Sequence, residues 1–248
     1  LSGSASFTGN IDFAGLAGSL TVADDAVYYG TLTNADNASV NVTGGSFGPN
    51  GLKTFSVGSL HVGADGTLTA YIDGQTGTSS HIYAGIASFD SGATISAKIN
   101  SLQGAEGSYV ILSAANIDGN PEFDEAATQL PYVFAGSVTA TETDLTLVIR
   151  RKTSSEVGLT SAAASGYDAI LTAALTDDVI SQSFLDIMDG DTLQTLIAQM
   201  LPDHSGAVFD AVTRGTRLVS RHVMDRDSEF STTETGDMGF WLEPVYWR

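Results

Sequence analysis

Two short motifs in the first half of the chain resemble catalytic sequences. Residues 44–48, Gly-Gly-Ser-Phe-Gly, match the pattern in which a strand-to-helix turn exposes a nucleophilic serine. Pro49-Asn50-Gly51 follows in place of a helix, so we interpret Ser46 as part of a turn. Asp90 begins an Asp-Ser-Gly sequence like that of aspartic proteases, whose chemistry needs two carboxylates sharing a proton. The sequence has no second copy, so we expect neither motif to be catalytic.

Acidic and histidine side chains supply potential metal ligands, but their spacing does not favour a metal site. One loop gathers the oxygen ligands that Ca²⁺ prefers, in a spacing that matches no EF-hand. Its residues are Asp118, Asn120, Glu122, Asp124 and Glu125. The four histidines are too scattered for a zinc site, and we expect them to be surface or packing residues. They are His61, His81, His204 and His222.

Composition and charge exclude several classes of partner. The chain has 10 basic and 29 acidic residues, and its formal net charge of -19 repels nucleic acids and anionic lipid surfaces. The absence of cysteine excludes disulfides, thiolate metal sites and a cysteine nucleophile. We therefore expect no cofactor, no metal, no nucleic-acid partner and no enzymatic activity. The first residues show no leader sequence, so we expect an upstream segment to be missing.

The composition changes near Arg150, which predicts two regions with different structure. Residues 1–149 contain 20 of the 27 glycines but only two of the ten basic residues, Lys53 and Lys98. The other eight basic residues begin at Arg150.

The first region consists of short alternating runs separated by turn residues, a pattern typical of half-buried strands. Residues 63–72 and 89–99 resemble each other, and Leu68 aligns with Ile95, 27 residues later. A repeat of this length indicates a solenoid, although the same short strands permit an antiparallel sandwich. The runs that we expect to be strands are 19–22, 39–42, 59–62, 67–72, 94–99, 109–112 and 144–149.

From about residue 160 the apolar residues follow a helical period. A first stripe includes Tyr167, Leu171 and Ala174, at the spacing of one helix face. Phe184 and Ile187 continue the pattern after Asp177-Asp178, and a third helical segment follows Asp189-Gly190-Asp191. The remaining members of the three stripes are Ile170, Leu175, Ile180, Met188, Leu193, Leu196, Ile197 and Met200.

Two features follow Pro202. A helix from about Ser205 to Met224 carries small apolar residues on one side and three arginines on the other, which suits either solvent or an acidic wall. The arginines are Arg214, Arg217 and Arg221. Beyond it, the last ten residues form an aromatic run, typical of a barrel strand at a membrane interface or of an aromatic edge strand on a soluble core. Its aromatic residues are Phe240, Trp241, Tyr246 and Trp247.

Three segments in this order resemble the passenger-to-barrel junction of bacterial autotransporters, the type V secretion proteins. They are Leu145-Thr146-Leu147-Val148-Ile149-Arg150-Arg151, Met200-Leu201-Pro202-Asp203-His204-Ser205-Gly206-Ala207 and Gly239-Phe240-Trp241-Leu242-Glu243-Pro244. The resemblance covers about residues 58–248. The chain departs from the family pattern because the remaining barrel strands are absent, and because its linker helix lacks the Asn-Asn pair that some members cleave.

The resemblance implies an architecture for the whole chain. Residues 1–152 would form a right-handed parallel β-helix, a mostly β fold, whose last rungs at 109–149 act as an autochaperone. A short helical array at 160–201 would follow, then a linker helix at 203–228 that threads the barrel pore. Residues 239–248 would be the first strand of a truncated outer-membrane β-barrel.

The resemblance also implies roles for individual residues and partners. Arg214, Arg217 and Arg221 would contact the barrel lumen. The remaining residues would act as autochaperone core or as membrane-interface aromatics: Tyr109, Ile111, Leu145, Leu147 and Ile149 in the core, and Phe240, Trp241, Tyr246 and Trp247 at the interface. The implied partners are the chain's own barrel, the outer-membrane assembly machinery and outer-membrane lipid, with the passenger outside the cell.

We therefore expect a non-catalytic stem and linker that supports folding and translocation of an autotransporter passenger. Two alternatives remain open at this point. An adhesin would share the fold, whereas a carbohydrate-active β-helix would need carboxylates clustered in an acidic groove.

Overall fold

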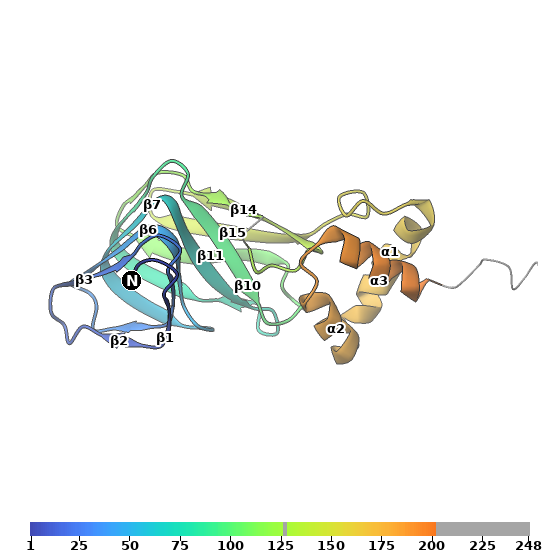
Figure 1. Ribbon diagram of the computed structural model, residues 1–248, viewed down its shortest axis with the longest axis horizontal. Coiled ribbons are helices and arrows are strands. Elements are labelled where there is room, and N and C mark those ends of the chain that lie inside the picture. The colour runs from blue at the N-terminus through green and yellow to red at the C-terminus, as the bar shows by residue number, and fades with distance from the viewer. Residues whose placement is uncertain (126–127, 202–248) are drawn as a thin grey trace, which may run out of the picture. The chain divides into compact units, whose positions relative to one another are not determined.

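The computed structural model describes residues 1–125 and 128–201, in which strands come first and helices follow (Figure 1). The expected mostly-β solenoid is confirmed: strands of successive coils pair in parallel over about 5 turns. The strands are β1 (Ser6–Thr8), β2 (Ile11–Asp12), β3 (Gly18–Val22), β4 (Val27–Tyr29), β5 (Leu32–Thr33), β6 (Ala38–Gly48), β7 (Thr54–Asp73), β8 (Thr78–Ser79), β9 (His81–Phe89), β10 (Thr94–Ile99), β11 (Gly107–Ala114), β12 (Ile117–Asp118), β13 (Glu122–Phe123), β14 (Phe134–Ala140) and β15 (Asp144–Arg151). The sandwich alternative is thereby excluded.

Among the described residues, the main sheet of the coils contains three parallel ladders that share one core, and β2 and β5 pair in parallel as a separate two-stranded sheet. The first ladder joins β3, β6, β7, β9 and β12, and its aligned inward residues are Leu20, Val40, Leu60, Ala87 and Ile117. The second joins β1, β4, β6, β7, β10 and β13, and aligns Phe7, Tyr28, Phe47, Leu68, Ile95 and Phe123. In the third, β7, β9 and β11 align Phe55, Ile82 and Leu112. Because side chains alternate along each strand, every second residue enters the core.

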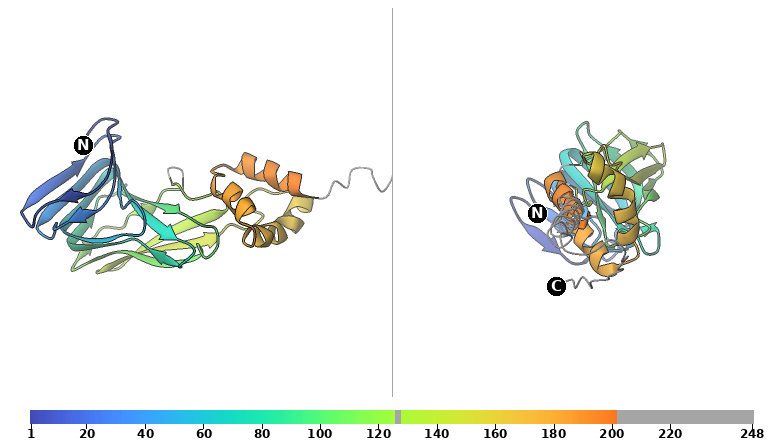
Figure 2. Two further views of the ribbon diagram at one scale, coloured as in Figure 1. Left: turned by 90° about the horizontal axis from the view of Figure 1, so that it is seen from below. Right: turned by 90° about the vertical axis from the view of Figure 1, so that its right-hand side faces the viewer.

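The predicted repeat is confirmed by the register, but it describes only part of the solenoid. Leu68 of β7 pairs with Ile95 of β10, as the 27-residue offset predicts. The earlier coils are shorter, since Leu20 pairs with Val40 and Val40 with Leu60, each 20 residues on. Both β6 and β7 run through a corner of the coil without interruption, and their chain paths are visible in Figures 1 and 2.

Polar side chains form a second set of contacts between coils on the outside of the ladders. Ser39 and Ser59 are joined by a hydrogen bond of 3.0 Å, and Thr67 and Thr94 by one of 2.8 Å. His61 contacts Ser88 at 3.0 Å. The in-register strands therefore align small polar groups outside as well as apolar groups inside.

The solenoid ends in an antiparallel hairpin. β14 and β15 pair along their whole length, and β15 also pairs antiparallel with β11. Thr141 N donates to Asp144 O at 2.8 Å, which closes a tight turn over Glu142 and Thr143. Of the residues 109–149 expected to stack as further rungs, β11, β12 and β13 do pair in parallel with the coil before them. From Phe134 onward the expectation is corrected, because so short a turn reverses the chain instead of carrying it around another coil.

Three helices follow, as the apolar period predicts: α1 (Ser161–Ala174), α2 (Asp178–Leu185) and α3 (Gly190–Met200). Asp177 and Asp189 cap α2 and α3 by accepting hydrogen bonds from backbone N–H groups of the first turn. Tyr167, Leu171, Phe184 and the other central stripe residues are buried. Met188 and Met200 also belong to the apolar stripes but are exposed, at 50% and 36%.

Within the part of the chain that the structure describes, no helix has the length and apolar character needed to span a membrane.

Candidate functional site

The closed end of the solenoid brings together the residues expected to form an autochaperone core. Tyr109 and Ile111 come from β11, and Leu145, Leu147 and Ile149 come from β15. All five are buried, with at most 5% exposure. β15 pairs with β11 on one side and with β14 on the other, so these side chains form one layer across the end of the core. We call the unit of β11, β14 and β15 the cap.

Tyr109 fixes the loop that precedes the cap. Its hydroxyl oxygen lies 3.0 Å from the backbone oxygen of Gly104 and 3.0 Å from that of Ala105, and its hydrogen is donated to this pair of acceptors. Burial raises the pKa of this phenol above its ordinary value, which keeps the proton available for these hydrogen bonds.

A histidine from the preceding coil forms a hydrogen bond to the backbone at a β-bulge in β11. The register shifts between Val110 and Leu112, and Nδ1 of His81 lies 2.9 Å from the carbonyl oxygen of Val110. Because a carbonyl oxygen only accepts, Nδ1 is the donor. His81 Nε2 lies 3.1 Å from Ser113 Oγ, and Ser113 in turn donates to Asp144 at 2.6 Å. Hydrogen bonds from Ser113 and then Thr143 hold the pKa of Asp144 below its ordinary value.

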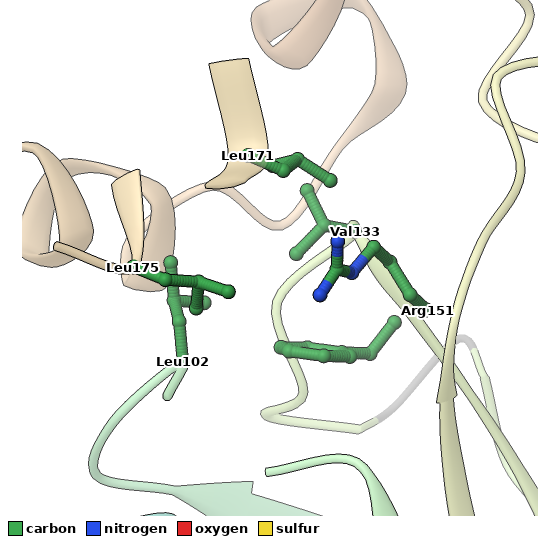
Figure 3. Close-up of a pocket in the computed structure, with 6 residues that line it drawn as sticks. Leu102, Val133, Arg151, Leu171 and Leu175 are labelled. Carbon is green, nitrogen blue, oxygen red and sulfur yellow. The ribbon is translucent and has the colours of Figure 1, made fainter. Parts of the chain in front are cut away.

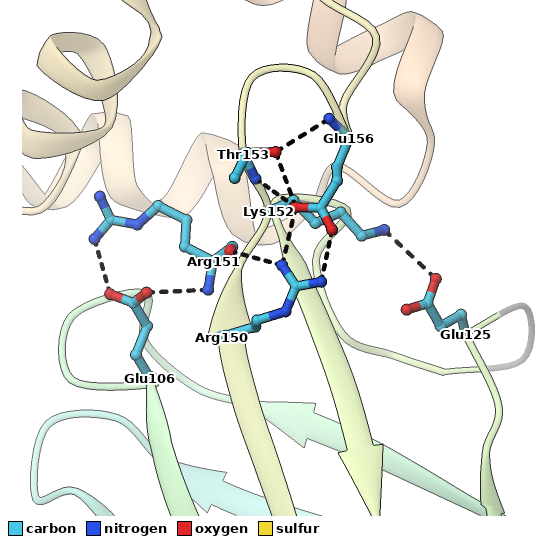
Figure 4. Close-up of polar contacts among 7 residues, drawn as sticks. All are labelled: Glu106, Glu125, Arg150, Arg151, Lys152, Thr153 and Glu156. Atoms are coloured by element: carbon cyan, nitrogen blue, oxygen red, sulfur yellow. Dashed lines mark hydrogen bonds and ion pairs between the residues drawn. The ribbon is translucent and has the colours of Figure 1, made fainter.

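Three consecutive basic residues at the end of β15 each pair with a carboxylate from a different loop (Figure 4). The Arg150 guanidinium makes two hydrogen bonds with Glu156, at 2.6 and 2.9 Å. Hydrogen bonds from Arg150 and then from Thr153 lower the pKa of Glu156 to about 2. The paired carboxylate in turn raises the pKa of Arg150.

The other two basic residues connect β15 to loops of the last coil. Arg151 donates to Glu106 from its backbone N–H at 3.0 Å and from its side chain at 2.9 Å. Lys152 lies 3.8 Å from Glu125, with its ammonium 4.2 Å from the centre of the Tyr132 ring. Exposed ion pairs contribute about 0–1 kcal/mol each, whereas truncating a buried leucine costs about 2–5 kcal/mol. The apolar layer therefore provides most of the stability, and the ion pairs fix the loops that meet there.

The cap also contacts the first helix. Leu102 and Val133 from the end of the solenoid face Leu171 and Leu175, as Figure 3 shows. Phe134 lines the same small pocket. The guanidinium of Arg151 lies beside this apolar contact. Backbone hydrogen bonding continues the connection, since Tyr132 N donates to Ile187 O at 2.8 Å.

The two catalytic-like motifs lie in the solenoid, within β6 and directly after β9. Gly44–Gly48 lies within β6, so Ser46 is in a strand and the interpretation of this segment as a turn is corrected. The chain does change direction there, because Gly45 adopts a φ of 65°. Asp90 lies 3.6 Å from Nε2 of His61.

Metal-ligand geometry was not found in the described residues: no group of three or more histidine, aspartate or glutamate side chains there is placed to hold an ion. The acidic residues from Asp118 to Glu125 extend through β12 and β13. Glu122 of β13 lies beside Thr94 of β10 in the parallel ladder, and Glu125, after β13, forms an ion pair with Lys152. His61 and His81 instead join successive coils through serines.

The remaining predicted site residues lie outside the described residues. They are the lumen-contact arginines Arg214, Arg217 and Arg221, the interface aromatics Phe240, Trp241, Tyr246 and Trp247, and the histidines His204 and His222.

Sequence reasoning missed the basic triplet, the histidine at the bulge and the hairpin direction. The triplet was detectable as the only run of three basic residues in the sequence, at the point where the composition changes. Its partners were not, because Glu106 and Glu125 are far from it along the chain. Comparison with known proteins identified no matching family model, no matching curated protein and no matching solved structure.

Proposed function

We propose that this chain is the stem and linker of a bacterial autotransporter passenger, and that the cap is the template on which its coils fold after translocation. The lumen contact of Arg214, Arg217 and Arg221 and the interfacial role of Trp241 and Trp247 belong to the same proposal. The motifs at residues 200–207 and 239–244 supply the family resemblance.

The single observation that carries the proposal is the closed C-terminal end of the solenoid. Leu145 and Leu147 lie on β15 and are fully buried. β15 pairs with β14 through a tight turn, joining residues 5 to 17 positions apart, and with β11 across 31 to 42 positions. Strands of the parallel ladders pair residues at least 19 positions apart. The β14–β15 hairpin therefore has a lower entropic cost of closure than these ladders and can form first, as the surface on which β11 and then the coils stack.

Folding outside the cell also supplies a driving force for secretion without nucleotide hydrolysis. Burial yields roughly 25 cal/mol per Å² of apolar area, while ordering costs roughly 1–2 kcal/mol per residue. An isolated coil exposes most of its apolar face and does not recover this cost, but a coil that stacks on an existing layer does.

The test is surface display of the full-length secreted protein with residues 109–149 deleted. Display should fall and the passenger should become sensitive to added protease. The matched control deletes residues 7–27, one coil in the register that pairs Phe7 with Tyr28, and should be displayed normally because the cap remains. Normal display and protease resistance without residues 109–149 would remove the template role.

A further inference from the structure

β14 is the last strand of the sheet, and its outer edge has no strand beside it in the part of the chain that is described. The sheet order ends β11, β15, β14. β14 pairs with β15 over all seven of its residues. No strand among the described residues pairs with the backbone groups on its other side.

Two backbone hydrogen bonds at the ends of the hairpin fix which backbone groups face outward. Lys152 N donates to Val133 O, and Thr141 N donates to Asp144 O, each at 2.8 Å. Bonded and non-bonded pairs alternate along an antiparallel ladder. Ala135, Ser137 and Thr139 therefore bond to β15, and the N–H and C=O groups of the alternate residues Gly136, Val138 and Ala140 point to the open edge.

This edge lacks the features that usually prevent strand addition. Natural edge strands are guarded by charged side chains, proline or a bulge. β14 reads Phe-Ala-Gly-Ser-Val-Thr-Ala, without a charged residue or proline, and its register with β15 is unbroken.

The same alternate residues present an incompletely covered apolar surface. Phe123 packs over Gly136, whereas Val138 and Ala140 are only partly buried against the core. A strand added to β14 would satisfy the outward backbone groups and cover these two side chains together.

We propose that the outer edge of β14 binds an extended segment of a partner polypeptide by β-strand addition. The segment has apolar residues at alternate positions and is neutral or basic. Charge selects against a second copy of this chain, because two chains of formal net charge -19 repel each other. Glu122 and Glu142 are exposed on β13 and at the hairpin turn that follows β14, which favours basic residues at the ends of the segment. This proposal is independent of the template role of the cap.

The test uses the whole chain and a capped synthetic peptide, Lys-Thr-Val-Thr-Val-Thr-Lys, with amide hydrogen exchange as the readout. Without peptide, the amides of Gly136, Val138 and Ala140 should exchange faster than those of Ala135, Ser137 and Thr139. The peptide should slow exchange at the first set. The acidic peptide Glu-Thr-Val-Thr-Val-Thr-Glu should bind more weakly, and a peptide with proline at its central position should not bind.

Val138→Pro removes an outward N–H without removing a hydrogen bond to β15, so it should abolish binding while Thr139 remains protected. Val138→Thr is the matched control: it keeps the N–H and should bind the basic peptide like the unaltered chain. If Val138→Pro does not fold, Ala140→Pro provides a second variant that removes an outward N–H. The proposal is overturned if no peptide binds up to about 1 mM, the concentration of a marginal interaction. It is also overturned if the outward amides are already protected in the absence of peptide, whether the chain is dimeric or monomeric.

Discussion

At the scale of residues, charged groups at and beside the end of β15 form ion pairs that hold neighbouring loops together. Glu156 accepts from Arg150 and from both the backbone and the hydroxyl of Thr153. These bonds require the carboxylate, so they couple the stability of the turn after β15 to pH.

We predict that the contribution of Glu156 to stability disappears in acid. Its pKa falls from 4.5 to about 2 on folding, mainly because of the hydrogen bonds from Arg150. A lowered pKa means that the contribution is complete above about pH 4.5 and is lost as the pH falls to about 2. The difference in thermal midpoint between the unaltered chain and Glu156→Gln should therefore shrink to zero over that range; a difference that stays constant would contradict this.

Tyr109→Phe should destabilise the chain by about 0.5–1.5 kcal/mol, the usual net value of one buried hydrogen bond. The substitution removes the hydroxyl that donates to Gly104 and Ala105 and leaves the ring in the core. Tyr83→Phe is the matched control, because Tyr83 is 51% exposed, and it should change stability by less than about 0.5 kcal/mol. Urea unfolding measures both, and equal effects would refute the role given to Tyr109.

At the scale of elements, tight corners allow successive coils to stack. Gly45 and Gly77 share a φ of 65°, but their surroundings differ. A Cβ at Gly45 would collide with the backbone oxygen of Ala26 in the preceding coil, whereas a Cβ at Gly77 would meet nothing within 4 Å.

Gly77→Ala should therefore cost about 1–2 kcal/mol, the penalty for left-handed backbone. Gly45→Ala should cost the same plus about 1–3 kcal/mol of overpacking, since Ala26 must move. Denaturant unfolding of the two variants checks the difference. Equal costs would mean that the coils are not in close contact at this corner.

The sequence predicted the elements better than their connections. Alternation identified β3, β10 and most of β15, and the similarity between residues 63–72 and 89–99 gave the register of Leu68 with Ile95. β14 was missed because glycine, serine, threonine and alanine give it little contrast in hydrophobicity. Strand direction could not be predicted either, because parallel and antiparallel strands show the same alternation. The hairpin of β14 and β15 was therefore expected to continue the rungs that β11, β12 and β13 form.

At the scale of the whole molecule, the solenoid has one end closed by its own hairpin. The apolar layer of the cap continues into the core of the coils, where Leu112 of β11 aligns with Ile82 of β9. This continuity lets the cap present a preformed layer to the coil before it. We therefore predict that folding runs from the cap toward the N-terminal coils.

The most direct test of this order is stopped-flow refolding of Leu147→Ala and Leu32→Ala in the 248-residue chain. Both leucines are buried, at 0% and 2% exposure, and each truncation should cost about 2–5 kcal/mol. If the cap folds first, Leu147→Ala slows refolding, whereas Leu32→Ala leaves refolding nearly unchanged and speeds unfolding. The reverse pattern, with refolding slowed only by Leu32→Ala, would contradict the account.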